Sequence, residues 1–422
     1  MDNGMRSFAY MKRSLSFVPL AASIVALSLM LNGCGGGGTS ERDAHVIRFW
    51  HFWSEPGQKQ ALLDLVHEFE KTRNVRVELT ELSWNDGKVK LQAAFNSGAP
   101  PDVIELGSDW VAQFSSSGVL LQLPGDAASV GRFVPYSLAP GTWNSRMYAY
   151  PWTIDTRVLY VNMDMLASVG VSTPPVTLDD VVATAEKLHD AGMMGWGANG
   201  ADAHRLYKKI LPLMWSYGGD VLDKQGRPTF YSPPNVAALE TYARLARAGM
   251  IETQRQLDAA FVQGKIGMWN SGSWLLKKIA ASPGKRIVPV LQPKFGAAQG
   301  VSFAGGEYLA VSAGATNTQM ARELVQFLVD GTNAVRFCRS VPEAGFPADS
   351  AYARDATLIA DPMKAVFAQQ LAHARMTPVH PRWLDLEEIL EDAVERVLLG
   401  EANPTESLAR AQSDAESLLG VK

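Results

Sequence analysis

The chain has 422 residues, of which 47% are hydrophobic and 19% are charged, a globular composition with enough length for two cores of ordinary domain size. The formal net charge is -4, and Lys and Arg never occur in runs longer than two, which argues against a nucleic-acid partner.

Residues 1–33 have the pattern of a segment that directs export. Lys12 and Arg13 precede the apolar run SLSFVPLAASIVALSLML, which is followed by LNGC and GGGG. A basic start, an apolar stretch and a small residue before Cys34 resemble a bacterial lipoprotein signal peptide, with Cys34 as the lipidated residue and residues 34–44 as a flexible tether. An uncleaved membrane anchor is the alternative, and the glycines after Cys34 disfavour it.

From residue 46 the sequence alternates between β-rich runs and amphipathic stretches. Ser54 is a candidate cap for a helix that carries Leu62, Leu65 and Phe69 on one face. We expect strands at 46–50, 75–79 and 100–106, with helices after Ser54 and at 88–98 and 108–118. This βαβαβα order predicts a doubly wound, mostly parallel sheet with helices on both faces.

The second half continues the α/β pattern and has no internal repeat. We expect strands at 157–162, 266–269 and 286–293, and a strand, a loop and a helix within 305–331. Helices are expected from Trp274 onward and at 178–191, 204–217, 234–248, 361–374, 384–399 and 404–419. The expected fold class is therefore α/β.

Catalytic and metal-binding signatures are absent from the sequence. It contains no G-x-S-x-G, H-E-x-x-H or Walker A motif, and no G-x-G-x-x-G after a predicted strand. If Cys34 carries lipid, Cys338 has no partner, which excludes a thiolate metal site and leaves Cys338 as a small buried hydrophobe. We therefore expect no catalytic residue, no metal and no cofactor.

Aromatic residues recur beside polar residues where predicted strands end. Such positions are Trp50, His51 and Trp53; Ser108 and Asp109; Trp152 and Asp155; Asn270, Gly272 and Trp274; Gly305, Gly306 and Glu307; and Arg382 and Trp383. In open α/β sheets the binding crevice lies outside the carboxyl ends of the strands, so we expect these loops to converge there. An aromatic ring covers the apolar face of a sugar while carboxylates and Arg bond its hydroxyls, so a sugar is the expected ligand class.

The competing interpretation places such rings in the core. Because side chains alternate between the two faces of a strand, we expect Phe49 and Phe52 to lie in the core, opposite Trp50 and His51. Asp155 and Arg157 have the alternative of pairing with one another at a hinge. Three tryptophans without a matching polar context are expected to be structural: Trp84, Trp143 and Trp196.

Several longer segments carry a family resemblance. After Cys34 the chain contains, in order, IRFWHFW, AFNSGAPPDVIELGSDWVAQFSSSGVLLQL, YAYPWTIDTRVLYVN, AFVQGKIGMWNSGSW and GGEYLAVSAGATNTQMARELVQFL. Together they resemble the family 1 extracellular solute-binding proteins, the maltose-binding-protein-like sugar receptors of ABC importers. The resemblance covers essentially the whole mature chain and implies a two-lobed type II periplasmic-binding fold, in which each lobe is a doubly wound sheet and a ligand cleft and hinge lie between the lobes.

The resemblance also implies domain limits and site residues. The implied N-terminal lobe is 45–150 plus 305–352, and the implied C-terminal lobe is 151–304 plus 353–422. The implied ligand-binding residues are those of the aromatic and polar loops above. Among them, Trp274 would stack on the sugar, Gly305 and Gly306 would allow close backbone approach, and Glu307 would accept hydroxyls.

The implied function is to bind a sugar, a disaccharide or small oligosaccharide of maltose or trehalose type, and to deliver it to an ABC importer without catalysis. The implied partners are the permease subunits, the cytoplasmic ATPase through them, and the membrane through lipid on Cys34. A monomer on the periplasmic face of a bacterial membrane is expected. Two alternatives stay open: a secreted carbohydrate-active enzyme with a carboxylate pair such as Asp109 and Glu307, or a receptor for another solute such as a glycerol phosphate or a polyamine.

Overall fold

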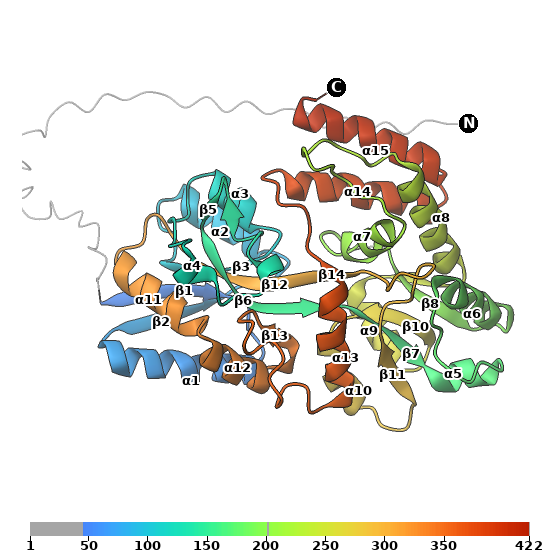
Figure 1. Cartoon of the computed structure of the whole chain (residues 1–422), viewed down its shortest axis with the longest axis horizontal. Coiled ribbons are helices and arrows are strands. Elements are labelled where there is room, and N and C mark those ends of the chain that lie inside the picture. The colour runs from blue at the N-terminus through green and yellow to red at the C-terminus, as the bar shows by residue number, and fades with distance from the viewer. Residues whose placement is uncertain (1–44, 201, 422) are drawn as a thin grey trace, which may run out of the picture. The chain divides into compact units, whose positions relative to one another are not determined.

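The computed structural model describes residues 45–200 and 202–421 of the chain (Figure 1). The expected signal peptide, the lipidation of Cys34 and the tether fall outside the described residues and stay predictions. Within residues 45–200 and 202–421, no helix combines the length and apolar character that a membrane crossing requires.

Two sheets form the framework. The first contains β1 (Val46–His51), β2 (Arg76–Glu81), β3 (Val103–Gly107), β6 (Ala149–Thr156), β12 (Ser302–Val311), β13 (Phe346–Pro347) and β14 (Ala374–Arg375). Their order is β13-β6-β12-β3-β1-β2, with β14 paired to β12. The second contains β7 (Val158–Asn162), β8 (Met194–Asn199), β9 (Gly249–Glu252), β10 (Ile266–Ser271) and β11 (Ile287–Val290), in the order β11-β7-β10-β8-β9. A hairpin of β4 (Thr142–Trp143) and β5 (Arg146–Met147) pairs separately.

Helices cover both sheets (Figure 1). Those of the first sheet are α1 (Pro56–Arg73), α2 (Gly87–Asn96), α3 (Val111–Ser116), α4 (Ala127–Val130), α11 (Thr318–Leu328) and α12 (Gly331–Ser340). Those of the second are α5 (Met163–Ser168), α6 (Leu178–Asp190), α7 (Tyr207–Ser216), α8 (Pro233–Arg247), α9 (Gln254–Val262), α10 (Trp274–Ala280), α13 (Pro362–Gln370), α14 (Trp383–Leu398) and α15 (Pro404–Leu419). The buried apolar side chains form one large cluster under α2, α3, α6, α7, α8, α14 and α15 and another under α1, α9, α11, α12 and α13. Each cluster extends over parts of both sheets.

The α/β class is as expected, and the pairing is more mixed than the sequence pattern predicts. Parallel pairing joins β2, β1 and β3 in the first sheet, and β10, β8 and β9 in the second. In contrast, β12 runs antiparallel to β3 and β6, and β7 runs antiparallel to β10 and β11. The expectation of mostly parallel sheets is wrong for these crossover strands, because each enters its sheet from the other sheet rather than through a βαβ unit.

Alternation along β1 explains its burial and corrects one expectation. Ile47, Phe49 and His51 point to one face because side chains two residues apart share a face of a strand. The rings of Phe49 and His51 lie 5.7 Å apart, and His51 Nδ1 accepts the backbone N–H of Trp53 at 3.2 Å. Phe49 and His51 are therefore neighbours in the core rather than opposite one another, and burial lowers the pKa of His51 to about 4.

Local signals place many of the elements, and the start of α1 and the strands β8 and β9 illustrate where these signals fall short. Helix α1 starts at Pro56, and its cap is Glu55 rather than Ser54; the Glu55 backbone N–H donates to Gln58 Oε1 at 3.2 Å. Pro56 suits the first helical position because its missing N–H needs no partner there. Strands β8 and β9 are absent from the sequence prediction, because their sequences, MGWGAN and GMIE, contain three glycines and only one β-branched residue, Ile251.

Candidate functional site

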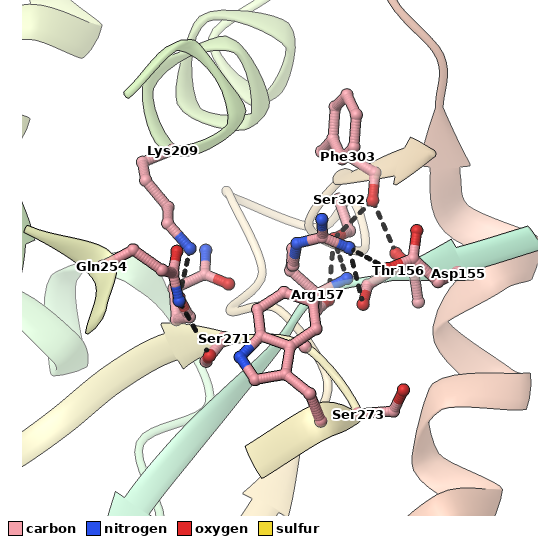
Figure 2. Close-up of polar contacts among 12 residues, drawn as sticks. Asp155, Thr156, Arg157, Lys209, Gln254, Ser271, Ser273, Ser302 and Phe303 are labelled. Carbon is pink, nitrogen blue, oxygen red and sulfur yellow. Dashed lines mark hydrogen bonds and ion pairs between the residues drawn. The ribbon is translucent and has the colours of Figure 1, made fainter. Parts of the chain in front are cut away.

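Arg157 connects β6 to β7, where the chain passes from the first sheet into the second. Its Nη1 donates to Asp155 Oδ2 at 2.5 Å, and its carbonyl accepts from Ser302 Oγ at 2.7 Å, at the start of β12. Figure 2 shows the guanidinium beside Asp155 and Phe303, with Lys209 approaching the second sheet from α7. Two strands that are far apart in the sequence thus hold a buried arginine at the junction of the sheets.

Two aromatic rings flank the Arg157 guanidinium. Its Cζ lies 4.6 Å from the centre of the Trp274 ring and 5.3 Å from that of Phe303, a geometry in which the cation is attracted to the rings. Trp274 Nε1 donates to Asp258 Oδ2 at 2.8 Å. Gly272 leaves room for the indole, since a Cβ on Gly272 would lie 1.9 Å from it. Trp274 is half-buried, so a fixed indole keeps part of its surface accessible.

The aromatic contacts continue from Phe303 to Tyr207 at the start of α7, and these two rings meet edge to face at 5.8 Å. Trp383 also meets the Tyr207 ring edge to face, with ring centres 5.6 Å apart. The Tyr207 hydroxyl donates to Asp109 Oδ2 at 3.0 Å. Because Asp109 follows β3, this hydrogen bond joins a helix of the second sheet to the carboxyl end of a strand in the first. Lys208 Nζ lies 5.5 Å from the Phe303 ring.

Acidic side chains of α14 fix the start of α7. Glu391 accepts the backbone N–H groups of His204 at 2.8 Å and of Tyr207 at 3.1 Å, and His204 Nδ1 contacts Glu387 Oε1. Carboxylates suit this position because the first N–H groups of a helix lack intrahelical partners. Burial raises the pKa of Glu387 to about 7, and the bond to Glu387 raises the pKa of His204. The network holds the Tyr207 ring in the position from which it reaches Asp109.

Two further carboxyl groups lie on the paired strands β3 and β12. Burial raises the pKa of Glu105 to about 8, and burial together with the nearby Glu105 and Asp155 charges raises that of Glu307 well above its ordinary value. Glu105 Oε2 accepts the Phe52 backbone N–H at 2.9 Å. Among the described residues, Glu105 Oε1 and Glu307 Oε2 are buried without a hydrogen-bond partner. A protonated carboxyl both donates and accepts, which suits a hydroxyl group of a ligand.

Two hollows elsewhere are poor matches for a sugar. A cavity of about 30 Å³ lies between α6, α7 and the second sheet, where Lys209 Nζ donates to the Asn270 carbonyl at 2.6 Å. That volume holds on the order of one water molecule, whereas ligand pockets measure roughly 300 Å³ or more. A more open hollow of about 370 Å³ is lined by residues between Val171 and Lys187 and has no aromatic side chain. The junction of the sheets combines rings and charges and is the stronger candidate.

Comparison with known proteins identifies the family. A family model described as bacterial extracellular solute-binding protein matches residues 53–330, more than half of the chain. The chain belongs to this family. The galactooligosaccharide-binding protein of Bacillus subtilis (strain 168) is 23% identical over 421 residues, which cover 94% of this chain and 96% of that protein. The diacetylchitobiose binding protein DasA of Streptomyces coelicolor is 27% identical over 345 residues, covering 75% of this chain and 78% of that protein.

Solved structures agree with the family. The GacH receptor of Streptomyces glaucescens, solved unliganded and in complex with acarbose, superposes with a TM-score of 0.78 and 24% identity, over 89% of this chain and 99% of that chain. Maltose-bound MalE3 of T. maritima superposes with a TM-score of 0.76. The fold is therefore the two-lobed type II periplasmic-binding fold that the sequence resemblance implies.

In this solute-binding protein, the structure brings four of the residues expected in the site to the junction of the sheets: Asp109, Asp155, Trp274 and Glu307. Asn270 lies nearby in β10, where its side chain accepts from Gln292 Nε2 at 3.0 Å. The pairing of Asp155 with Arg157, held open as the alternative at a hinge, is present. Whether these residues bind a ligand stays a prediction.

Most of the other expected site residues are buried in the core. Trp152 is 0% exposed and stacks on Phe337 at 4.5 Å, and Trp53 packs edge-on against both rings. Trp152 is buried because β6 is covered on both faces, so its side chains do not reach solvent on either face of the sheet. His51, Ser108 and Trp383 are buried as well, and Trp50 is partly buried against the core. The side chain of Arg382 is exposed and pairs with Asp385 at 2.6 Å.

Gly305 and Gly306 allow close packing of the crossover strands. A Cβ on Gly306 would lie 2.2 Å from the Thr153 carbonyl oxygen, and one on Gly305 would lie 2.8 Å from the Phe303 ring and 3.1 Å from Asp155 Oδ1. The space that a side chain would fill is therefore occupied by β6 and by Phe303. These glycines let the two crossover strands pair closely, and their part in binding a ligand stays a prediction.

Sequence reasoning missed three side chains at the junction: Phe303, Tyr207 and Lys208. Phe303 and Tyr207 lie within β12 and α7, and nothing in their spacing separates them from core residues. Trp84 was expected to be structural but is 41% exposed, whereas Trp196 is buried as expected. Cys338 is buried and free, and burial raises its pKa to about 12, in agreement with a small hydrophobe.

Proposed function

We propose that the protein binds a sugar, a disaccharide or small oligosaccharide, outside the cytoplasmic membrane and delivers it to an ABC importer without catalysis. The observation that carries the proposal is the group of side chains at the junction of the sheets. Trp274 offers a fixed, half-buried indole beside Arg157, and Arg157 is paired with Asp155. A flat apolar surface next to strong donors and acceptors matches the two chemistries of a sugar ring.

The named relatives support this ligand class. Their names refer to galactooligosaccharides and to diacetylchitobiose, ligands of more than one sugar ring, and the GacH receptor was solved with acarbose. An ionic solute is less well matched, because the acidic Asp155 is already paired with Arg157. No group of three or more His, Cys, Asp or Glu side chains suited to a metal ion occurs in the described part of the chain.

The remaining parts of the proposal concern placement and motion. Lipid on Cys34 anchors the protein at the periplasmic face of a bacterial membrane, and the protein acts as a monomer on the permease subunits of the importer. The lobes are 45–150 plus 305–352 and 151–304 plus 353–422. They close over the sugar about the β6 and β12 crossovers, where Asp155 and Arg157 pair.

A ligand screen tests the proposal. Wild-type protein is mixed with mono-, di- and trisaccharides, and the melting temperature and intrinsic tryptophan fluorescence are measured. We expect at least one sugar to raise the melting temperature and to bind with a micromolar or lower Kd, and the Trp274→Ala variant to lose most of that response. No shift with any sugar would contradict the proposal.

One observation favours a second candidate, a carbohydrate-active enzyme. The raised pKa of Glu307 is the property of a general acid, and glycosidases place two carboxyl groups on either side of the scissile bond. Product analysis after incubation with the sugars that bind distinguishes the two functions. A receptor returns the sugar intact, whereas cleavage that Glu307→Gln abolishes would establish the enzyme.

A further inference from the structure

Trp84 differs from the other tryptophans of this protein. It lies in the turn between β2 and α2, and 41% of its surface is accessible, whereas every other tryptophan that the structure describes is buried or half-buried. Trp110, its neighbour, is only 5% exposed. The part of the indole that stays exposed gains nothing from the hydrophobic effect, and a ligand that covers it would add to the apolar area buried.

The Trp84 ring is rigidly supported from below. It stacks on Phe52 with ring centres 3.9 Å apart and an angle of 15° between the planes, and it meets Trp110 edge to face at 5.5 Å. Phe52 and Trp110 also meet edge to face, at 5.7 Å. Because Phe52 covers one face of the indole, the exposed surface belongs to the opposite face and the free edges. The result is an aromatic platform with a fixed orientation, which loses little entropy when a ligand covers it.

A polar group of the proposed sugar site adjoins this platform. A Cβ on Gly107 would lie 2.7 Å from Asp109 Oδ1 and 3.4 Å from Trp84 Cζ3, so the carboxylate and the indole reach the same point at the end of β3. The other oxygen of Asp109 accepts the Tyr207 hydroxyl at 3.0 Å. Asp109 therefore adjoins Trp84 and also accepts the Tyr207 hydrogen bond that joins the two sheets.

Charges of both signs also surround this edge of the site. Lys88 in α2, four residues after Trp84, is half-buried, and burial lowers its pKa. Four nearby carboxylates act in the opposite direction and raise the pKa of Lys88: Glu387, Asp385, Asp109 and Glu388. The N-terminal end of α2 therefore lies near the carboxylates at the start of α14. Ammonium and carboxylate groups form charge-assisted hydrogen bonds with hydroxyls. Stacking surface, donor and acceptors thus occur together around Trp84.

We infer that Trp84 is the stacking platform for an additional sugar ring of an oligosaccharide and sets the preferred ligand length. The inference rests on the proposed sugar-binding function. The ring nearest the junction contacts Trp274 and Asp109, and the next ring lies over Trp84. Trp84 then adds affinity for ligands with the additional ring and adds little for shorter ones.

Calorimetric titrations of the wild type, Trp84→Ala, Trp84→Phe and Tyr231→Ala test the inference. The ligands are malto-, cello-, galacto- and chito-oligosaccharides of two, three and four rings. Tyr231→Ala is the matched control, because Tyr231 is an exposed aromatic residue, 52% accessible, next to α8. Thermal melts establish that each variant is folded.

In the series that the wild type binds, we expect Trp84→Ala to weaken the longer ligand about tenfold, equivalent to about 1.4 kcal/mol, and the shorter one less than twofold. Trp84→Phe should keep most of the affinity, and Tyr231→Ala all of it. Equal loss at every length, or no loss at any length, overturns the role of Trp84 while sugar binding stands. Absence of binding by the wild type to every series overturns both proposals.

Quenching by iodide supplies a second measurement that does not depend on affinity. Iodide quenches exposed tryptophans, so the difference in quenching between the wild type and Trp84→Phe reports on Trp84. We expect a saturating trisaccharide or tetrasaccharide to abolish this difference and a disaccharide to leave it. A difference that persists with every bound ligand contradicts the inference.

Discussion

Glu105→Gln tests whether the junction contains a neutral carboxyl group. The Glu105 side chain is 0% exposed, and burial raises its pKa from 4.5 to about 8. Between these two pH values the folded protein holds a proton that the unfolded chain has released. The folded state therefore binds more protons than the unfolded state, and the contribution of Glu105 to stability falls as the pH rises through this window.

The shift sets the size of the effect. At about 1.4 kcal/mol per pH unit, a pKa raised from 4.5 to about 8 corresponds to a cost of roughly 5 kcal/mol above pH 8 and none below pH 4.5. Glutamine removes this cost but buries an amide group whose unpaired donors cost about 1 to 3 kcal/mol. We therefore expect Glu105→Gln to stabilise the protein by about 2 to 4 kcal/mol at pH 8 and to destabilise it slightly at pH 5.

Urea denaturation of both proteins at pH 5, 6, 7 and 8 provides the assay. The Phe52 backbone N–H donates to Glu105 Oε2 at 2.9 Å, and the side-chain oxygen of the substituted glutamine can accept the same hydrogen bond. Glu240→Gln is the matched control, because Glu240 is exposed on α8 and its substitution should leave the pH dependence unchanged. A stability difference between the wild type and Glu105→Gln that is constant from pH 5 to pH 8 would refute a protonated Glu105.

Three other substitutions test the geometry of the site. Trp274→Ala should weaken sugar binding at least tenfold in calorimetry and change the melting temperature little, because the indole is half-buried; unchanged affinity would remove Trp274 from the site. Gly306→Ala should lower the free energy of unfolding by about 1 to 3 kcal/mol in urea, because its Cβ would lie 2.2 Å from the Thr153 carbonyl oxygen, and a neutral result would show that the strands separate easily. Tyr207→Phe removes the 3.0 Å bond to Asp109 and should cost about 1 to 2 kcal/mol of stability, which a melt equal to that of the wild type would contradict.

The fold was largely predictable because its signals are local. The alternation of apolar residues, the start of α1 at a proline and the amphipathic C-terminal helices are each set by nearby residues. The antiparallel crossovers were not predictable in this way. Their pairing depends on contacts such as Glu307 with Gly107 and Gly306 with Ile154, which join segments about 150 to 200 residues apart.

The sequence pointed to some of the residues that meet at the junction of the sheets, and whether they form a binding site stays a prediction. The pattern of aromatic residues beside carboxylates at strand ends includes Asp109, Asp155 and Trp274, which the structure places at the junction of the sheets. Sequence does not reveal whether a strand has one covered face or two, and coverage of both faces of β6 is what buries Trp152 fully. Burial of a strand on both faces is a property of the packed layers, so it appears only in the structure.

A crystal structure of the protein with its tightest-binding sugar tests the central claim most directly. We predict electron density for a sugar ring at the junction of the two sheets, in contact with Trp274 and within hydrogen-bond distance of Asp109. Density for the sugar only in the hollow along residues 171–187, or on the outer surface of either sheet, would contradict the account.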